Sequence, residues 1–517
     1  TSINQGTLIL THDSGVGTGT LALADGTTLR GGTMGLRTLA NAVQLGSVNG
    51  DVATVHVPFT GGDDFSFNGV ISGAGGLRIT SDASGRTVTL TNSNTFSGGV
   101  ILDGTGGNLR PNLTISNAAA LGSGTLTSRM PVATLGGGLL TLVGDLSAGA
   151  GVVNDFVIDP GARLSVSVAN AGKLSGVISG TGDLVKLDNG ILTLSGTNSY
   201  SGVTTISAGT LSVSTIGNGG IAGNIGQAGV AAGNLVLGGG TFQYTGTAES
   251  TDRNFTLVTG TTSTIDVTDS NNLTISGASA NTTGALTKSG SGTLTLAGGN
   301  QYTGLTTISA GTLVYGASNV IASGDVTVNG GVLALGNNQS ETVGTVTVAN
   351  GGSITGTGTS SLTSTGSFEM QSGSVSAILA GAGIALNKTS AGTVTLSGVN
   401  TYTGVTSIDS GVLSVSSIGN GSVAGNLGQA SSAAANLVLG GGTLQYTGTN
   451  ASTDRSFTLT NASSSTIDIA IPGTNLTLSG AGENTTGALT KAGAGTLTLS
   501  GANLHTGPVS YTHLTLP

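Results

Sequence analysis

The sequence repeats one short segment five times at an interval of about 100 residues. The segment reads Ile-Leu-Thr-Leu-Ser-Gly-Thr-Asn-Ser-Tyr-Ser-Gly-Val-Thr-Thr-Ile over residues 191–206, and closely similar segments cover 293–308 and 393–408. A looser copy covers 87–102, and a fifth begins at 496 and departs from the pattern after 507. The aromatic position of the five copies is filled by Phe96, Tyr200, Tyr302, Tyr402 and His505. A regular internal period predicts a stacked repeat architecture, in which each repeat contacts its neighbours.

Composition narrows the class of protein. Only 7% of the 517 residues are charged, 93 are Gly, and the hydrophobic fraction of 37% is too high for a disordered chain. Collagen is excluded because there is no Gly-X-Y period and only seven residues are Pro. Basic residues are too few for a nucleic-acid-binding face, and no apolar run reaches the length of a membrane helix. The chain opens with neither Met nor a signal peptide, and we interpret both ends as cut.

Cysteine is absent from the chain. The sequence therefore excludes disulfides, a thiolate nucleophile and a zinc–thiolate site. The absence of disulfides is compatible with export of an unfolded chain through a narrow pore.

The pattern within one copy predicts short strands. Leu294 and Leu296 alternate with threonines, as in a strand with one apolar face. Gly and Asn at 298–300 predict a turn, and 307–309 and 313–315 predict two further short strands. No helical stretch separates these strands. We therefore expect an all-β fold, a single-stranded right-handed parallel β-helix (β-solenoid) with coils of about 20 residues.

A longer duplication is superimposed on the shorter repeat. Residues 216–255 recur at 418–457 with a constant shift of 202 positions. After Asp266 and Asp468 the shift becomes 203, so that 281–288 matches 484–491. A solenoid tolerates a one-residue insertion of this kind in a turn.

The extended repeat resembles a known family. The pattern Leu-Thr-Lys-x-Gly-x-Gly-Thr-Leu-Thr-Leu-Ser-Gly-x-Asn-x-Tyr-x-Gly-x-Thr-x-Ile-x-x-Gly-x-Leu is similar to the passenger-associated transport repeat of Gram-negative autotransporters (type V secretion). Copies of this pattern lie near 77–102, 184–213, 286–315, 386–415 and 489–507. The resemblance implies that 1–507 is a β-helical passenger fragment at the cell surface, tethered to the outer membrane by a C-terminal β-barrel that this chain lacks. Residues 508–517 break the pattern, and we interpret them as a non-native tail and a sequence artefact.

The resemblance also implies a function. Passengers of this family commonly act as adhesins or aggregation factors, and their repeats aid export and folding. We therefore expect a non-enzymatic surface rod for adhesion or cell–cell association, with no catalytic, cofactor-binding or metal-binding residue and no cofactor. The expected partners are host or bacterial surface molecules, protein or glycan, together with self-association, and not nucleic acid. Two alternatives stay open, a β-helical polysaccharide hydrolase or lyase and a passive spacer that carries a functional domain preceding Thr1.

Few residues could support catalysis or metal binding. A Ser-His-Asp triad would need His12 or His56, since His505 fills the aromatic position and His513 lies in the tail, and we find no local support for either. A groove enzyme would need paired carboxylates. The candidates are Asp63 with Asp64, Asp155 with Asp159, Asp183 with Asp188, and Asp266 with Asp269. We interpret these pairs as solvated turn residues, which could at most hold calcium weakly.

Several polar residues recur at matching positions. We interpret the charged ones as surface charges that keep the rod soluble and prevent strand pairing; they are Lys186, Lys288, Lys388 and Lys491, and the pairs Asp252-Arg253 and Asp454-Arg455. An Asn two residues before the aromatic position is expected to cap a turn, and the aromatic ring is expected to pack over it. These Asn residues are Asn94, Asn198, Asn300, Asn400 and Asn503.

Overall fold

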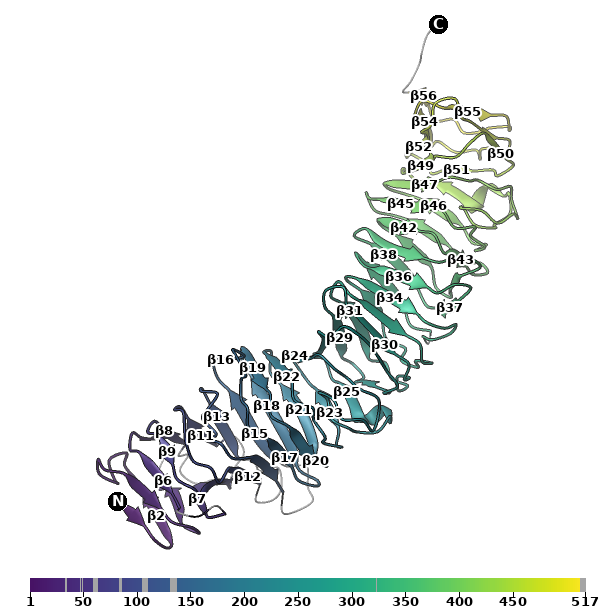
Figure 1. The fold of residues 1–517 in the computed structure, drawn as a ribbon. Coiled ribbons are helices and arrows are strands. Elements are labelled where there is room, and N and C mark those ends of the chain that lie inside the picture. The colour runs from purple at the N-terminus through teal and green to yellow at the C-terminus, as the bar shows by residue number, and fades with distance from the viewer. Residues whose placement is uncertain are drawn as a thin grey trace. The chain divides into compact units, whose positions relative to one another are not determined.

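The computed structural model describes residues 1–32, 35–46, 48, 50–58, 64–82, 86–104, 110–130, 137–321 and 323–511. The chain divides into two compact units, residues 1–266 and 267–517, and each is described by itself. Within each unit, short strands stack coil upon coil (Figure 1). The ladders are parallel: Leu184 lies beside Thr204 in the first unit, and Thr306 lies beside Val326 in the second. The expected all-β parallel solenoid is therefore confirmed.

The first unit contains four sets of paired strands. The first set is β1 (Ser2–Ile3), β3 (Leu21–Leu23), β6 (Val43–Leu45) and β9 (Ile71–Ser72). The second set is β2 (Thr7–Leu10), β4 (Thr28–Gly31), β7 (Val52–Val57), β10 (Gly76–Ser81), β12 (Val100–Gly104), β14 (Leu126–Arg129), β17 (Phe156–Ile158) and β20 (Ile178–Gly180). The third set is β5 (Arg37–Leu39), β8 (Phe65–Phe67), β11 (Thr87–Leu90), β13 (Asn112–Ile115), β15 (Gly137–Leu142), β18 (Arg163–Val168), β21 (Asp183–Leu187), β23 (Thr204–Ile206), β25 (Leu235–Leu237) and β28 (Thr256–Leu257). The fourth set is β16 (Asp145–Leu146), β19 (Ala171–Leu174), β22 (Ile191–Leu194), β24 (Thr210–Val213), β26 (Thr241–Tyr244) and β29 (Thr262–Val267). The unit also contains β27 (Ala248–Thr251) and the short 3-10 turn η1 (Ala232–Asn234).

The second unit also contains four sets of strands. The first is β31 (Ala285–Ser289), β33 (Thr306–Ile308), β35 (Val326–Asn329), β38 (Val346–Ala349), β41 (Phe368–Met370), β44 (Leu386–Lys388), β46 (Thr406–Ile408), β48 (Leu437–Leu439) and β51 (Thr458–Leu459). The second is β30 (Asn272–Ile275), β32 (Thr293–Leu296), β34 (Thr312–Tyr315), β36 (Val332–Leu335), β39 (Gly352–Thr355), β42 (Gly373–Val375), β45 (Thr393–Leu396), β47 (Val412–Val415), β49 (Thr443–Tyr446), β52 (Ser464–Ile469), β54 (Ala488–Ala492) and β56 (Val509–Tyr511). The third is β37 (Ser340–Val343), β40 (Ser361–Ser364) and β43 (Ile378–Ala380), and the fourth is β50 (Ala451–Thr453), β53 (Asn475–Leu478) and β55 (Thr496–Leu499). A second 3-10 turn is η2 (Ala434–Asn436).

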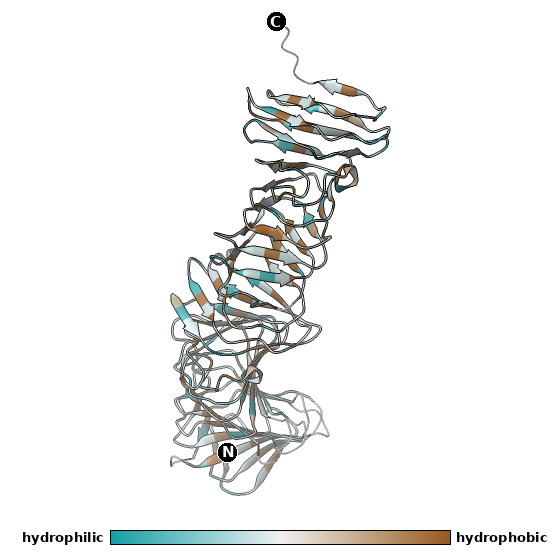
Figure 2. Cartoon of the chain, turned by 90° about the vertical axis from the view of Figure 1, so that its right-hand side faces the viewer, coloured by the Kyte–Doolittle hydropathy of each residue, from teal (hydrophilic) through white to brown (hydrophobic). Residues whose placement is uncertain are grey.

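Most strands bury every second residue. In β32 the leucines Leu294 and Leu296 are fully buried, while the threonines between them are only partly so. Apolar positions recur in this way from coil to coil, and the hydrophobic colouring of the strands alternates along their length (Figure 2). Each buried aliphatic side chain contributes about 1.5–3 kcal/mol, and together these side chains supply the main driving force for stacking the coils.

Coil length varies with position in the chain. Leu184 pairs with Thr204, and Thr204 pairs in turn with Leu235, so the second of these steps is much longer than the first. In the second unit the step from Thr406 to Leu437 is equally long. The expected coil length thus holds for the coils that contain the motif. After the copies with Tyr200 and Tyr402 the following coil carries extra residues, whereas after the copy with Tyr302 the step from Thr306 to Val326 is short. We call the steps from Thr204 to Leu235 and from Thr406 to Leu437 the long steps.

Two observations concern the helices and the C-terminal segment. None of the helices in the described part of the chain is long and apolar enough to cross a membrane. Strand β56 pairs in parallel with β54, through Val509 beside Leu489. The remaining residues of the C-terminal segment, 512–517, and with them His513, lie outside the described residues.

Candidate functional site

The Asn of the copies with Tyr200 and Tyr402 joins three parts of the backbone, whereas Asn300 and Asn503 bond one neighbouring coil and their own turn. The side-chain oxygen of Asn198 accepts the N–H of Ile178 at 2.8 Å, and its amide donates to the carbonyl of Asn224 at 2.5 Å. In the second unit Asn400 makes the same two bonds, to Leu379 and Asn426. The expected capping role of this Asn is confirmed.

The aromatic ring of the motif lies inside the coil. Tyr200, Tyr302 and Tyr402 have no exposed surface. Each hydroxyl shares a hydrogen bond with the Thr four residues later, at 2.6 Å for Tyr200 and 2.9 Å for Tyr302 and Tyr402. Burial raises the pKa of all three phenols well above the ordinary value. The rings are therefore part of the core and cannot act as stacking platforms for a ligand.

Three of the four motif lysines contradict our expectation of surface charges, and the fourth, Lys491, is partly buried. Lys186 is 1% exposed, and Lys288 and Lys388 are fully buried. The ammonium of Lys186 donates to the carbonyls of Leu187 and Asp188 in its own coil, at 2.5 and 2.6 Å, and of Ala208 in the next coil, at 3.3 Å. Burial lowers the pKa of Lys186 to about 8, although the nearby Asp188 opposes this shift.

The other motif lysines repeat this arrangement. Lys288 donates to Ser289, Gly290 and, in the next coil, Ala310. Lys388 likewise donates to the carbonyls of Ser390 and Ser410. The motif Lys therefore fastens a turn to the coil that follows it, because its ammonium needs carbonyl acceptors once it is buried.

The extra residues of the two long steps form matching loops over the motif Tyr. We call residues 214–234 the first excursion and residues 416–436 the second excursion. The first folds back so that Asn198 and Gly223 exchange two backbone hydrogen bonds, of 2.9 and 3.2 Å, and Asn400 and Gly425 do the same in the second. Gly226 has a φ of +77°, and a Cβ there would lie 2.4 Å from the carbonyl oxygen of Tyr200. The loop thus approaches the backbone around the Tyr closely, which requires Gly at this point.

An arginine clamps each excursion from the coil above. Arg253 is 3% exposed, and its guanidinium donates to the carbonyls of Gly217, Ile221, Gly226 and Ala228, at 2.8 to 3.2 Å. Arg455 is 2% exposed and donates to the corresponding Gly419, Gly428 and Ala430, at 2.8 to 3.3 Å. Burial lowers the pKa of both arginines, and neighbouring acidic groups oppose the shift. The interpretation of these residues as solvated charges is therefore wrong for the two arginines.

The aspartate that precedes each arginine bonds the same loop. Asp252 accepts the N–H of Gly219 at 2.7 Å, and Asp454 accepts that of Gly421 at the same distance. The first excursion has a further acceptor, because Glu249 takes the N–H groups of Ile216 and Gly217 at 2.8 to 3.1 Å. The position that matches Glu249 in the second unit is Ala451, which offers no such bond.

A different acid fills the corresponding place above Tyr302. The segment that covers this Tyr is short, and Glu341, 1% exposed, accepts the N–H groups of Val320 and Ile321 at 2.9 and 3.4 Å. Burial raises the pKa of Glu341 to about 7, while the backbone N–H bonds oppose this shift. Reasoning from the sequence missed Glu341, since it has no repeated counterpart.

The carboxylates that the sequence suggested as pairs do not act together. They bond separately, each to a backbone N–H or to a polar side chain. Asp64, Asp155 and Asp183 accept the N–H groups of Thr87, Val177 and Val203, each at 2.8 Å. The remaining partners are Arg129 for Asp159, Ser167 for Asp188 and Gln243 for Asp266. Asp269 lies in a turn with a φ of +51°. Asp63 lies outside the described residues.

Each described histidine has a partner, and the partners of His56 lie on the next coil, 24 and 26 residues later. Its two ring nitrogens lie 2.9 Å from the Thr80 hydroxyl and 3.0 Å from a carboxylate oxygen of Asp82. Thr80 is only 6% exposed, so its hydroxyl is poorly placed to attack a substrate. His12 lies 2.9 Å from Ser14, and His505 packs against Phe457 with ring centroids 6.3 Å apart. Among the described residues, no group of three or more His, Cys, Asp or Glu side chains could hold a metal ion.

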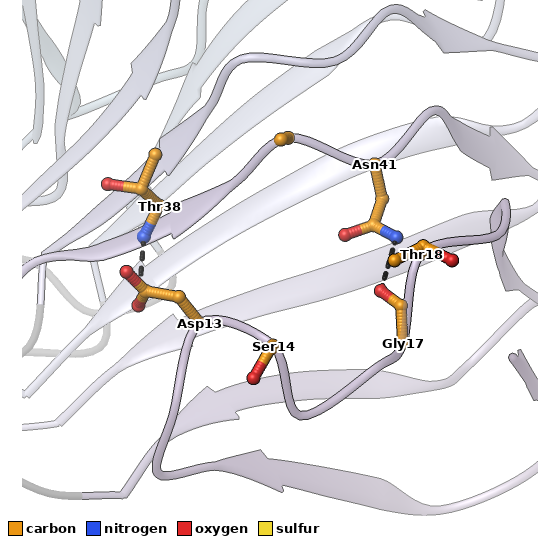
Figure 3. A pocket seen from close by; sticks show the side chains of 7 residues that line it. Asp13, Ser14, Gly17, Thr18, Thr38 and Asn41 are labelled. Carbon is orange, nitrogen blue, oxygen red and sulfur yellow. Dashed lines mark hydrogen bonds between the residues drawn. The ribbon is translucent and has the colours of Figure 1, made fainter.

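A shallow hollow near the N-terminus is lined by small polar residues. Figure 3 shows Asp13 accepting the N–H of Thr38, at 3.2 Å, and Asn41 donating to the carbonyl of Gly17, at 2.9 Å. Asn41 also donates to Gly19 at 2.7 Å. These polar groups are used to join neighbouring coils, so the hollow resembles the other turns of the solenoid rather than a reaction centre.

Comparison with known families identifies the repeats. The model of the passenger-associated transport repeat matches residues 184–213, 286–314, 386–415 and 489–510. These four stretches contain Tyr200, Tyr302, Tyr402 and His505, together with the lysines described above. The looser copy near 77–102 is not among the matched stretches.

One curated relative aligns with most of the chain. The protein called "Adhesin BmaC autotransporter", from Brucella suis biovar 1 (strain 1330), is 36% identical to it in an alignment of 482 residues. The alignment covers 87% of this chain and 13% of the relative. The chain thus corresponds to a small part of the length of that protein.

Proposed function

The chain belongs to the proteins that carry passenger-associated transport repeats, and from this premise we propose that it is part of an autotransporter passenger that acts in adhesion at the cell surface. The observation that carries the proposal is the relation of most of the chain to a protein named as an autotransporter adhesin. On this proposal the passenger stands outside the cell, tethered to the outer membrane.

We propose further that the adhesion is not enzymatic. Several charged side chains that could serve a reaction are used inside the fold, as Lys288, Arg455 and Asp183 illustrate. A catalytic acid or base must be free to meet a substrate, whereas these groups are bonded to the backbone. The partner is then a surface molecule of a host or bacterial cell, protein or glycan, held by several weak contacts that add up.

The test uses the full-length gene and the chain in parallel. The gene is expressed in a Gram-negative host, and intact cells are labelled with an antibody raised against this chain. We expect labelling without permeabilisation and increased attachment to host cells and to other bacteria. Absence of labelling on intact cells that do contain the protein would contradict the surface location.

Beads coated with the purified chain separate the remaining alternatives. If the chain itself is adhesive, coated beads attach to the same surfaces. If only cells with the full-length protein attach, the chain is a spacer for another domain. If Asp155→Asn or Asp266→Asn abolishes attachment, or a polysaccharide is cleaved by the chain, the non-enzymatic proposal is wrong.

A further inference from the structure

The segment above Tyr302 lacks one of the bonds that hold the excursions. We call residues 316–321 the strap. The carbonyl of Val320 in the strap accepts the backbone N–H of Asn300 at 2.8 Å. Among the described residues, the side-chain amide of Asn300 donates only to Gly298 of its own turn. In the two copies that carry excursions, the corresponding amide donates to the excursion, so the strap is attached less firmly to the motif turn.

A buried carboxyl group holds the strap from the coil above. Glu341, on β37, accepts the N–H groups of Val320 and Ile321. In the next coil, β40 places Leu362 beside Glu341. The carboxyl group therefore meets hydrogen-bond donors on one side and hydrocarbon on the other, and it has no cation as a partner among the described residues. Such surroundings favour the neutral form of a carboxyl group.

A buried phenol directly precedes the strap. Tyr315, the last residue of β34, has no exposed surface, and its hydroxyl has no hydrogen-bond partner among the described residues. The matching residues of the two copies with excursions are the buried Val213 and Val415, which need no such partner. Burial, and then the nearby Tyr302 and Glu341, raise the pKa of Tyr315 well above its ordinary value. An unpaired buried hydroxyl destabilises the closed arrangement.

From these observations we infer that the strap is a proton-controlled latch, which lies closed over Tyr302 while Glu341 is neutral and lifts more often once Glu341 is ionised. Lifting the strap hydrates the carboxylate, and it admits water to the hydroxyl of Tyr315. Both buried groups therefore favour the lifted state. The excursions do not share this response, because Arg253 and Arg455 keep their charge.

The other titratable groups around Glu341 do not account for such a response. The strap, β36 and β40 contain no Asp, Glu, Lys, Arg or His. Tyr302 and Tyr315 stay neutral near pH 7, because burial raises the pKa of each phenol. The nearest acid along the chain, Asp325, is exposed and accepts the N–H of Thr345 at 2.7 Å. Glu341 is therefore the group whose charge changes inside this coil.

The direction of the response follows from the two states of the strap. In the lifted state Glu341 is hydrated and has the ordinary pKa of 4.5, whereas burial raises its pKa to about 7 in the closed state. Between these values the lifted state has released a proton that the closed state holds. The strap therefore lifts about tenfold more often for each unit that the pH rises in this range, and the effect levels off above it.

Labelling of an introduced cysteine measures the lifting, because the chain has no Cys of its own. Val320 is 2% exposed, so V320C reacts with dithiodipyridine only when the strap lifts. The control is V343C, at a fully buried valine of β37 in the same coil as Glu341. Each rate is divided by that of the same chain unfolded in denaturant at the same pH, which cancels the ionisation of the thiol. From pH 5 to pH 7 we expect the normalised rate of V320C to rise about thirtyfold and that of V343C to stay unchanged.

Variants made in the V320C chain separate the two buried groups. E341Q keeps an oxygen that accepts the two N–H groups but does not ionise, so its normalised rate should not depend on pH. Y315F removes the unpaired hydroxyl and should be labelled about tenfold more slowly at every pH, with the pH dependence retained. Y402F, at a buried phenol of another copy, is the control and should leave the labelling of V320C unchanged.

Four outcomes would overturn the inference. They are a rate of V320C that does not depend on pH, a pH dependence that survives E341Q, faster labelling in Y315F, and equal pH dependence of V320C and V343C. The last outcome would show that the coil unfolds as a whole. None of these outcomes depends on what the passenger adheres to, so the latch and the proposed function are tested separately.

Discussion

In the second unit, two motif copies hold the segment above their Tyr with buried side chains of opposite charge. Above Tyr402 the chain makes a long step, from Thr406 to Leu437, and its loop is clamped by Arg455. Above Tyr302 the step is short, and the segment is held by Glu341. In the long loop carbonyl groups converge and need a donor, whereas in the short segment N–H groups converge and need an acceptor. The sign of the buried charge therefore matches the backbone groups that point inward: a cation meets carbonyls, and an anion meets N–H groups.

Arg455 and Glu341 differ in how their charge depends on pH. A guanidinium stays charged over the accessible pH range, even with the lowered pKa of Arg455. The carboxyl of Glu341, with a pKa of about 7, changes its charge near neutrality. The two coils should therefore respond differently to the same change of pH.

The largest expected effect is that of Arg455→Met. The substitution leaves the carbonyls of Gly419, Gly428 and Ala430 buried without their donor. We expect the free energy of opening of residues 418–436 to fall by about 3–5 kcal/mol, measured by hydrogen exchange with mass spectrometry. Arg129→Met removes a half-exposed ion pair with Asp159 and should cost less than about 1 kcal/mol. If Arg455→Met and Arg129→Met had equal effects, the buried Arg455 would stabilise its loop no more than a half-exposed ion pair does.

The second prediction concerns the pH dependence of the coil that contains Glu341. Between pH 4.5 and about 7 the native chain holds a proton that the unfolded chain has released. The free energy of unfolding of this coil therefore falls as the pH rises through that range, by up to about 3 kcal/mol. Glu341→Gln should remove this slope.

Hydrogen exchange of residues 316–345, compared between wild type and Glu341→Gln at each pH, measures this dependence. The ratio between the two proteins cancels the intrinsic effect of pH on exchange. The segment 418–436 serves as an internal control, because Arg455 does not titrate there. A wild-type slope that persists in Glu341→Gln would show that another group is responsible.

A smaller effect is expected for Lys388→Met, which keeps the volume of the buried chain but removes its ammonium. The carbonyls of Ser390 and Ser410 then lose a donor, while the cost of burying a charge also disappears. We expect a net loss of about 1–3 kcal/mol in the opening free energy of 386–411. Lys173→Met, at a partly exposed lysine that donates to Gly149, is the control and should change little. A gain of stability in Lys388→Met would mean that the buried charge costs more than its bonds contribute.

The smallest effect sharpens the comparison between the two excursions. Glu249→Ala gives the first excursion the residue that the second has at this position, Ala451. The N–H groups of Ile216 and Gly217 lose their acceptor, and we expect a loss of about 1–2 kcal/mol in the opening of 214–234. Thermal unfolding combined with hydrogen exchange measures it. An unchanged loop would indicate that the bonds of Arg253, Asp252 and Asn224 hold it without Glu249.

The buried charges could have been recognised from the strand pattern. Lys288 lies two residues after Leu286 on β31, so strand alternation places it on the inward face. Arg253 lies between β27 and β28, but it is buried in the same two-residue period as Thr251 and Phe255. Glu341 shares a face with Val343 in the same way. We interpreted the motif lysines and the two arginines as surface charges because they are charged, and did not consider their two-residue period.

The sequence by itself determined the repeat, the short alternating strands and the length of the coil that contains the motif, because these depend on neighbours within a few positions or on the repeat period. It also indicated that Asn198 and its counterparts cap backbone groups; which groups these are was decided by stacking, since Ile178 and Asn224 lie 20 and 26 residues from Asn198. Only the tertiary structure decided what the buried charges meet. The carbonyls that receive Arg455 belong to a loop 25 to 36 residues earlier, and their direction depends on how that loop folds over Tyr402. Stacking brings donor and acceptors together, so their match is a property of adjacent coils and not of either segment alone.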